Sequence, residues 1–149
     1  MAIYRFKAGS HIKADAQEAA AVCEKLANEG NLTARSLVDV SRPEDAPLHD
    51  EFDWNDTTAA ESWREHQARR IIGSLEIIVE EKEPVRAFFS VVTHEPQYTH
   101  INAILRSEDE TERLLRMAYR ELQAFQRKYS RLEALRGVFE AIGKLEVAE

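Results

Sequence analysis

The sequence predicts an α+β protein: a helix-turn-helix-like N-terminal subdomain of three helices, a small antiparallel sheet and a long C-terminal helix. Three patterns predict this order. Apolar residues recur at helical spacing over residues 1–75, short β-branched and aromatic runs follow, and an apolar seam in steps of three and four occupies the last third. We expect residues 1–106 to hold the N-terminal helices and the sheet. Residues 107–149 would form the long helix, which oligomerises or packs on the sheet.

The first two helices are delimited by residues that begin and end helices. Asp15 can accept hydrogen bonds from the free N–H groups of a first helix, and Gly30 can end that helix. Thr33 can cap a second helix, which ends at Arg42-Pro43 because the residue before a proline avoids the helical region. The residues expected to face inward are Ala19, Val22, Cys23, Leu26, Leu37, Val38 and Val40.

A third helix is expected to begin near Thr58, because Glu61 three residues later completes a capping box. Its sequence, TAAESWREHQARRIIGSL, places one group of residues near a common face and leaves Arg64 and Arg69 elsewhere. The group near the common face comprises Ala59, Trp63, Gln67, Arg70 and Ile71.

Three runs rich in β-branched and aromatic residues predict strands. They are LEIIVEE (75–81), VRAFFSVVTH (85–94) and QYTHINAILR (97–106). Because the connections between them are short, we expect an antiparallel meander or hairpin. Near the N-terminus, Ile3, Tyr4 and Phe6 could form a further short strand or an arm packed on the body of the protein.

The C-terminal third opens with SEDE, a capping box that carries acids in the first helical turn. The apolar residues that follow predict a helix from about residue 108 to 135 and a second short helix to about residue 145. The first helix would be about 42 Å long, more than a domain of this size easily covers. Its seam therefore packs on the chain's own sheet or partly meets another subunit. The residues expected at a subunit interface are Leu115, Leu122, Phe125, Tyr129 and Leu132.

The composition limits the classes of function. The chain has 149 residues, of which 44% are hydrophobic and 32% charged, as is typical of a globular protein rather than a disordered chain. Its formal net charge of −7 argues against nucleic-acid binding by the whole surface, so any such binding needs a local basic patch. No run approaches the roughly 20 apolar residues of a membrane span. We expect no membrane partner and a cytoplasmic location.

Motifs of catalysis and of cofactor binding are missing from the sequence. It contains no P-loop, GxGxxG, CxxC or Gly-x-Ser-x-Gly pattern, and its one cysteine, Cys23, lies on the apolar face of a predicted helix. In SRPEDAPLHDEFDWND, residues 41–56, His49 and the neighbouring acids lack the spacing of metal ligands. We therefore expect a non-enzymatic protein with no cofactor and no metal, in which this acidic stretch forms a polar turn.

The span AAAVCEKLANEGNLTARSLVDVS has the rhythm of the first two helices of a winged helix-turn-helix. The reading helix would then be PEDAPLHDEF, which is acidic, whereas base reading in the major groove needs exposed Arg, Lys, Asn or Gln. Two interpretations stay open: neighbouring arginines bind DNA, or the helices form a subdomain without DNA contact. The arginines expected to contact nucleic acid are Arg35, Arg42, Arg64, Arg69 and Arg70; the alternative is that they are solvated and paired with nearby acids.

Five stretches are informative together: YRFKAGS, LTARSLVDVSRPEDAPLHDEFDWND, EHQARRIIGSL, PVRAFFSV and LQAFQRKYSRLEALRGVFEAI. Over most of the chain, they resemble a family of small uncharacterised proteins encoded by bacteriophages and prophages. The resemblance carries no catalytic or binding motif. It implies a phage or prophage origin, a place in the cytoplasm of a host cell and an accessory role.

These observations lead to one expected function and two alternatives. We expect a phage or prophage accessory protein that associates with duplex DNA through the helix-turn-helix-like subdomain, in regulation or in packaging-type recognition, and that forms a homo-oligomer. The first alternative is an adaptor or assembly factor that presents the acidic surface of residues 43–56 to a protein partner. The second is an acidic DNA mimic that inhibits a host protein.

Overall fold

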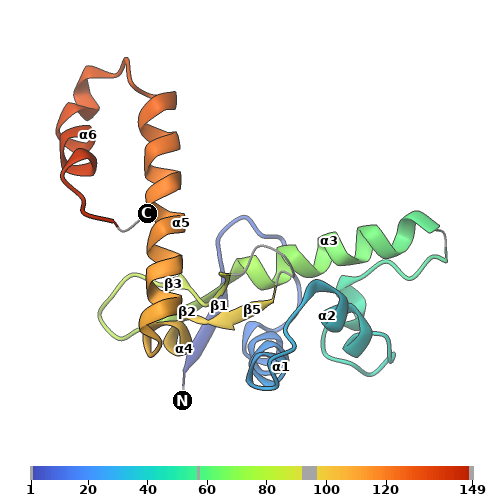
Figure 1. Ribbon diagram of the computed structural model, residues 1–149. Helices are drawn as coiled ribbons and strands as arrows, with labels where there is room; N and C mark the ends of the chain where they lie inside the picture. The colour runs from blue at the N-terminus through green and yellow to red at the C-terminus, as the bar shows by residue number, and fades with distance from the viewer. Residues whose placement is uncertain (1, 57, 92–96, 148–149) are drawn as a thin grey trace. The chain divides into compact units, whose positions relative to one another are not determined.

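The computed structural model describes residues 2–56, 58–91 and 97–147. The chain divides into two compact units, Met1–Ala103 and Ile104–Glu149. It combines helices with small antiparallel sheets, so the predicted α+β class is confirmed (Figure 1). The two units are described separately below.

The first sheet of the N-terminal unit joins the start of the chain to its middle. Its strands are β1 (Ile3–Phe6), β2 (Leu75–Ile78) and β3 (Val85–Arg86), antiparallel and in the order β1-β2-β3. Tyr4 lies opposite Ile77, and both side chains are buried. The expected N-terminal strand and the β2–β3 hairpin are therefore present. Because β1 and β2 lie far apart in the sequence, no local sequence pattern predicts that they pair.

A second sheet consists of β4 (Phe88–Ser90) and β5 (Tyr98–His100), which pair antiparallel. Ala87 connects the two sheets: its N–H donates to the Leu75 carbonyl at 3.0 Å, and its carbonyl accepts from the Ile101 N–H at 2.8 Å. The single strand predicted over residues 85–94 is therefore divided between two sheets. Its last three residues lie outside the described part of the chain.

The strand predicted over residues 97–106 is wrong in its second half, because Ile101–Leu105 forms the short helix α4. The His100 Nδ1 accepts the Asn102 N–H at 3.1 Å and so ends the strand with a local turn. Ile101 and Ile104 are three residues apart, a spacing that suits a helical face better than the alternating faces of a strand.

The helices α1 (Ala16–Asn28) and α2 (Ala34–Val40) have the predicted caps. The Asp15 side chain accepts the Glu18 N–H at 2.9 Å, and Thr33 forms a capping box with Ser36. After α1, Gly30 has φ +69°, and its N–H donates to the Ala27 carbonyl while the next N–H donates to the Leu26 carbonyl. Both bonds belong to a Schellman motif, in which glycine removes the steric cost of the left-handed conformation.

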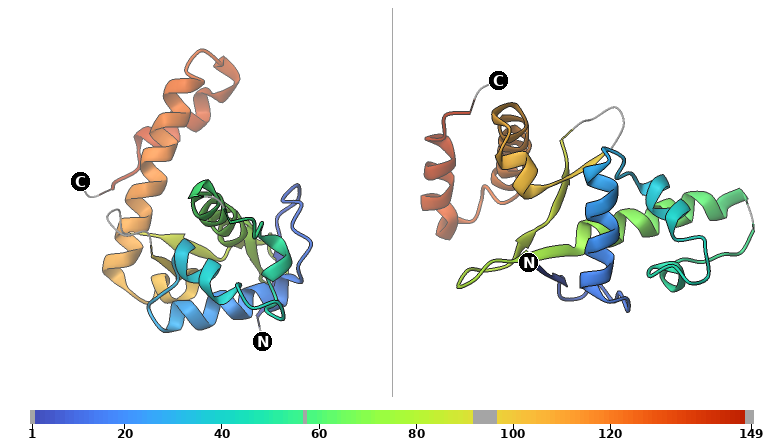
Figure 2. Two further views of the ribbon diagram at one scale, coloured as in Figure 1. Left: turned by 90° about the vertical axis from the view of Figure 1, so that its right-hand side faces the viewer. Right: turned by 90° about the horizontal axis from the view of Figure 1, so that it is seen from below.

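The helix α3 (Thr58–Ser74) lies beside α2 (Figure 2). Its orientation differs from the prediction: the Trp63 side chain is 52% exposed, whereas Arg64 is 3% exposed. Small residues explain this orientation, because Ala60 and Ala68, one helical turn before and one turn after Arg64 on the same face, let this face of α3 approach its neighbours closely. The buried residues of α3 are Ala60, Arg64, Ala68, Ile71, Ile72 and Ser74.

The C-terminal unit contains α5 (Glu108–Lys128), the 3-10 helix η2 (Glu133–Leu135) and α6 (Arg136–Gly143), which folds back beside α5 (Figures 1 and 2). The Ser107 side chain caps α5 as predicted, accepting the Glu110 N–H at 3.3 Å. The helix expected to reach residue 135 instead ends at Lys128: Tyr129 leaves the helical conformation with φ −110° and ψ 17°, and Leu132 is extended with φ −85° and ψ 96°. The reversal brings the Phe125 and Phe139 rings together, with centroids 6.2 Å apart.

Candidate functional site

The acidic stretch of residues 41–56 is a packed turn that contains one short 3-10 helix, η1 (His49–Glu51), and no α-helix. Leu48 and Phe52 anchor it in the hydrophobic core. A Glu51 carboxylate oxygen accepts the backbone N–H groups of Lys13 and Ala14 at 2.8 and 2.6 Å. The stretch, which the sequence placed at the position of a reading helix, therefore does not form a helix that could enter a groove.

The Trp54 ring adds a second anchor to this turn. Its Nε1 donates to the His49 carbonyl at 2.8 Å, and its ring stacks on the His49 ring with centroids 5.0 Å apart. The guanidinium of Arg64 lies 5.0 Å from the centroid of the Trp54 ring. These contacts leave the turn little freedom to change shape.

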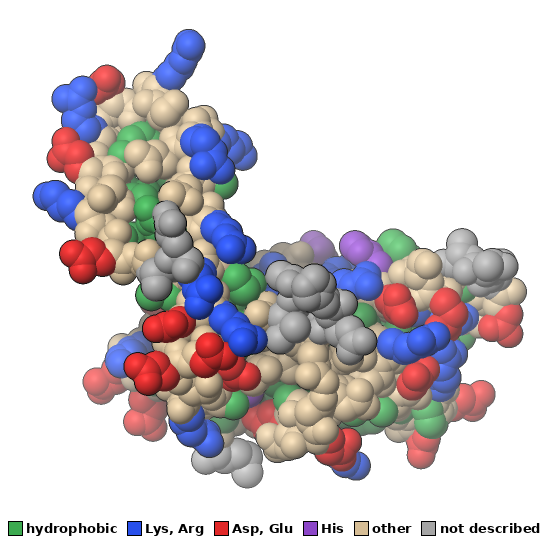
Figure 3. Space-filling view, viewed as in Figure 1, with side chains coloured by type: hydrophobic (Ala, Val, Ile, Leu, Met, Phe, Trp, Pro, Cys, Tyr) green, Lys and Arg blue, Asp and Glu red, His purple; other side chains and the backbone are tan. Residues whose placement is uncertain are grey.

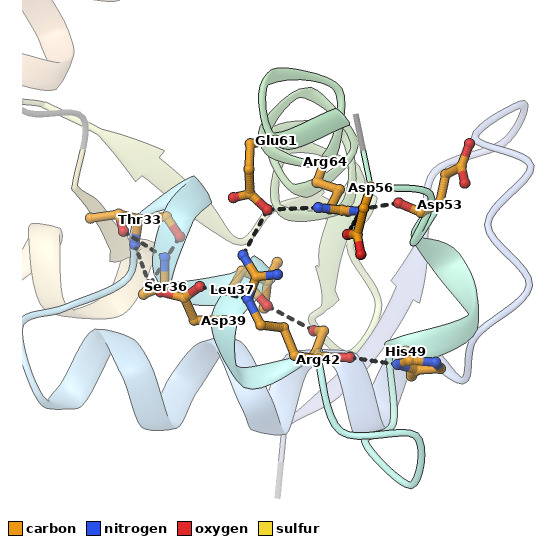
Figure 4. A network of polar contacts seen from close by, with 11 residues as sticks. Thr33, Ser36, Leu37, Asp39, Arg42, His49, Asp53, Asp56, Glu61 and Arg64 are labelled. Atoms are coloured by element: carbon orange, nitrogen blue, oxygen red, sulfur yellow. Dashed lines mark hydrogen bonds and ion pairs between the residues drawn. The ribbon is translucent and has the colours of Figure 1, made fainter. Parts of the chain in front are cut away.

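The buried side chain of Arg64, on α3, links this turn to the helix by hydrogen bonds. Its guanidinium donates to the Asp53 carbonyl at 2.7 Å and to a Glu61 carboxylate oxygen at 2.8 Å (Figure 4). It also donates to the Asn55 carbonyl at 2.9 Å. The planar guanidinium can satisfy several acceptors at once, which compensates for the cost of burying its charge. Arg64 is therefore occupied within the chain, although the sequence suggested it as a nucleic-acid contact.

Arg42 belongs to the same network. It donates to Asp39 at 3.0 Å and to Glu61 at 2.7 Å, so Glu61 bridges Arg42 and Arg64 (Figure 4). These hydrogen bonds, first that from Arg42 and then that from Arg64, hold the pKa of the Glu61 carboxyl below its ordinary value. Glu61 thus binds two arginines, whereas the side chain of Thr58, its partner in the predicted capping box, lies outside the described part of the chain.

The opposite side of α3 carries a different set of side chains. We call Trp63, His66, Arg69 and Arg70 the outer face of α3; all four are exposed. The Trp63 ring stacks on the His66 ring with centroids 5.4 Å apart and planes 23° apart. Arg69 forms a long ion pair with Glu65 at 3.6 Å. In the space-filling view, histidine, basic and hydrophobic side chains gather along the edge that α3 forms (Figure 3).

A cavity of about 480 Å³ lies at the C-terminal end of this outer face. Its wall holds four cationic side chains and one histidine, and none of its lining residues is acidic. We call it the basic pocket; its lining residues are Lys7, Gly9, Ser10, His11, Arg69, Arg70, Gly73, Ser74 and Arg86. Because α3, β3 and the loop after β1 all contribute, only the folded chain assembles this cluster of positive charge.

The loop after β1 is held against the end of α3 by its backbone. The Lys7 N–H donates to the Ser74 carbonyl at 2.9 Å, and the Ser10 N–H donates to the Lys7 carbonyl at 3.2 Å. Gly9 has φ +81° and His11 has φ +56°, so two of the pocket's backbone positions lie in the left-handed region. A non-glycine residue in this region is uncommon and occurs often at functional sites.

Arg86 is positioned from outside the pocket. Its Nε donates to the Phe88 carbonyl at 2.8 Å, and its guanidinium lies 4.9 Å from the centroid of the Phe89 ring. One edge of the guanidinium is thereby fixed, and the other N–H groups can reach a ligand. The Ser74 hydroxyl, in contrast, already donates its hydrogen bond to the Arg70 carbonyl, at 2.6 Å.

The five arginines suggested by the sequence fall into three environments. Arg69 and Arg70 line the basic pocket, Arg42 and Arg64 hold the acidic turn, and Arg35 is exposed on α2 outside the pocket. Sequence reasoning missed Lys7, Arg86 and the exposure of Trp63. A sequence pattern could have indicated Lys7, because residues 2–13 contain basic residues and no acid. No sequence pattern indicates Arg86, because only the pairing of β3 with β2 brings it to the pocket.

The described residues show no group of three or more His, Cys, Asp or Glu side chains that could hold a metal ion. Cys23 is fully buried on α1, and burial, with a smaller effect of Glu24, raises the pKa of its thiol to about 12. A thiol in this state is a poor nucleophile. No helix among the described residues is long and apolar enough to cross a membrane.

No family model, curated protein or solved structure matches this chain. Its function must therefore be inferred from the outer face of α3 and the basic pocket.

The buried position of Arg64 gives a test of this geometry. Arg64→Ala should lower the free energy of unfolding by about 1–3 kcal/mol, because it leaves two backbone carbonyls of the turn without donors. Arg69→Ala, on the exposed side of the same helix, should change it by at most about 0.5 kcal/mol. Urea denaturation followed by circular dichroism measures both values. Equal losses for the two variants would show that Arg64 is not buried in this way.

Proposed function

We propose that the protein is a non-enzymatic nucleic-acid-associated protein, with the basic pocket as its phosphate site and the outer face of α3 as its base-contacting surface. The observation that carries the proposal is the pocket itself. Lys7, Arg69, Arg70 and Arg86 surround one cavity without an acid in its wall, in a chain whose net charge is −7. Such a local concentration of positive charge on an acidic protein favours an anionic ligand.

The neighbouring aromatic residue favours a nucleic acid over a small anion. The exposed Trp63 lies seven residues before Arg70 on one helix, about 10 Å away at 1.5 Å per residue. That distance matches about three stacked nucleotides at 3.4 Å each. A strand whose phosphate occupies the pocket could therefore place a base on the indole, and stacking on aromatic rings is a common way of binding bases.

The order of the elements supports a helix-turn-helix-like role for this unit. The helices α1, α2 and α3 precede the β2–β3 hairpin, which is the order of a winged helix-turn-helix, and in this proposal α3 acts as the reading helix. The hairpin turn contains Glu80, Glu81 and Glu83 and one lysine, so phosphate contact would depend on the pocket. An accessory role in a phage or prophage, in regulation or packaging, is part of the proposal and rests on the sequence resemblance.

The phosphate role is tested by Arg69/Arg70→Ala. We expect the double variant to bind duplex and single-stranded DNA about tenfold or more weakly, and the slope of log K against log salt to fall by about two, one for each lost phosphate contact. Fluorescence anisotropy over a series of salt concentrations measures both. Lys25/Lys82→Ala removes the same charge from exposed positions of the same unit that do not line the pocket, and serves as the control. If the two variants bound nucleic acid with equal affinity, or if the wild-type protein bound none at low salt, the phosphate role would be contradicted and the adaptor hypothesis would be favoured.

The stacking role is tested by Trp63→Ala. Loss of the indole should weaken binding to a single strand by about 1–3 kcal/mol for one stacked base, and it should change duplex binding little because duplex bases are stacked on one another. Trp63→Phe keeps an aromatic ring and should retain most of the affinity. Titration calorimetry with a single strand and its duplex gives the comparison. An equal loss for Trp63→Phe and Trp63→Ala would argue against stacking.

A further inference from the structure

The C-terminal unit has almost no hydrophobic core of its own. Among its described residues, only Ile104 and Ile142 are buried hydrophobics, and the 21-residue helix α5 contains no buried residue. A unit of this size rarely buries enough apolar surface to be stable without an additional partner. The contact between Phe125 and Phe139 joins α5 to α6 but leaves most of the apolar seam uncovered.

The uncovered side chains are large and regularly spaced. On α5 and the turn that follows it, Leu115 is 51% exposed, Leu122 36%, Phe125 38% and Leu132 51%. The three residues on α5 follow one another in steps of seven and three, as in helices that pack lengthwise against other helices, and Leu132 lies in the turn beyond the end of α5. A seam of this kind marks an interaction site for another helix.

The charges on α5 indicate which helix that is. Its first five residues contain Glu108, Asp109, Glu110 and Glu112, and the only base before residue 116 is Arg113. From Arg116 to its end, α5 contains four bases and one acid, namely Arg116, Arg120, Glu121, Arg127 and Lys128, and Arg131 follows in the turn. The helix is therefore acidic at one end and basic at the other, a pattern that also suits the helix dipole.

Such a helix is complementary to itself only in one orientation. Two parallel copies would place acids beside acids and bases beside bases. Two antiparallel copies would place each acidic end against a basic end, and both would cover the same apolar seam. The two contacts would be identical by two-fold symmetry, the commonest arrangement of a homodimer.

We infer that α5 is a self-association surface, which a second copy of this chain covers in antiparallel orientation. A hollow of about 220 Å³ fits this pairing; it is lined by Glu112, Leu115, Arg116, Glu146 and Val147. When residues 108–112 of one copy lie opposite residues 127–128 of the other, Leu115 lies opposite about residue 122, so an antiparallel partner brings its Leu122 towards this hollow. The inference is independent of the proposed nucleic-acid function, although a dimer would carry two outer faces of α3 and bind a long strand more tightly through both.

Charge reversal on the full chain tests the orientation. Glu108/Asp109/Glu112→Lys makes the N-terminal end of α5 basic like its C-terminal end, and Arg127/Lys128/Arg131→Glu makes the C-terminal end and the turn after it acidic like the N-terminal end. We expect wild-type protein to sediment as a dimer that dissociates at high salt, and each variant alone to self-associate at least tenfold more weakly. An equimolar mixture of the two variants should restore the dimer. A wild-type chain that stays monomeric at high concentration, or a dimer that high salt strengthens, would overturn the inference.

A second measurement needs no substitution. Mixed ¹⁴N- and ¹⁵N-labelled wild-type chains are treated with a carbodiimide, which joins an amine to a carboxylate without a spacer. The two ends of α5 are about 30 Å apart within one chain, so a crosslink between Lys128 and the acids at residues 108–112 must join two chains. We expect peptides that carry both labels at these positions. Crosslinks between chains that join Lys128 only to Glu121 or Glu133 would indicate a parallel pair and contradict the inference.

Discussion

The buried guanidinium of Arg64 is the interaction on which the candidate site depends. It holds the carbonyls of Asp53 and Asn55 and the carboxylate of Glu61, so it fixes both the acidic turn and the rotation of α3. Desolvating a charge is costly, and this arginine is stable in the interior only because its N–H groups have acceptors there. With Arg64 turned inward, helical geometry turns Trp63, His66, Arg69 and Arg70 outward.

This arrangement keeps opposite charges apart. The acids of residues 43–56 lie around the N-terminal half of α3, where Arg42 and Arg64 are paired with acids and with backbone carbonyls. The cations of the basic pocket lie at the other end of the helix, with Lys7 and Arg86 supplied by other elements. A protein with a net charge of −7 can attract a phosphate only where such a separation exists. The acidic turn is thus part of the support of the site, and its rigidity helps to define the outer face of α3.

Local signals in the sequence predicted much of the fold. The caps at Asp15, Thr33 and Ser107 and the glycine after α1 act within one helical turn, so their chemistry is visible in neighbouring residues. The division of the middle strand at Ala87 was not predicted, because it depends on Leu75 and Ile101 from elsewhere in the chain. The end of α5 at Lys128 was missed as well, since its apolar seam continues beyond the break.

The site was predicted only in part, for the same reason. Arg69 and Arg70 were identified because clustered arginines on a predicted helix are visible in the sequence, but Lys7 and Arg86 join them through sheet pairing. The rotation of α3 was misjudged because tryptophan is usually buried and arginine usually exposed. The alanines at positions 60 and 68, four residues before and after Arg64, carried the correct signal.

The rotation of α3 is the central claim, and tryptophan fluorescence tests it directly. Trp54→Phe leaves Trp63 as the only indole, and Trp63→Phe leaves Trp54. Acrylamide should quench Trp63 strongly and its emission should lie at long wavelength, because its side chain is 52% exposed. Trp54, stacked on His49 beside Arg64, should be shielded and emit at shorter wavelength. A shielded Trp63 would contradict the account, because Trp63 would then face the interior and Arg64 would face the solvent.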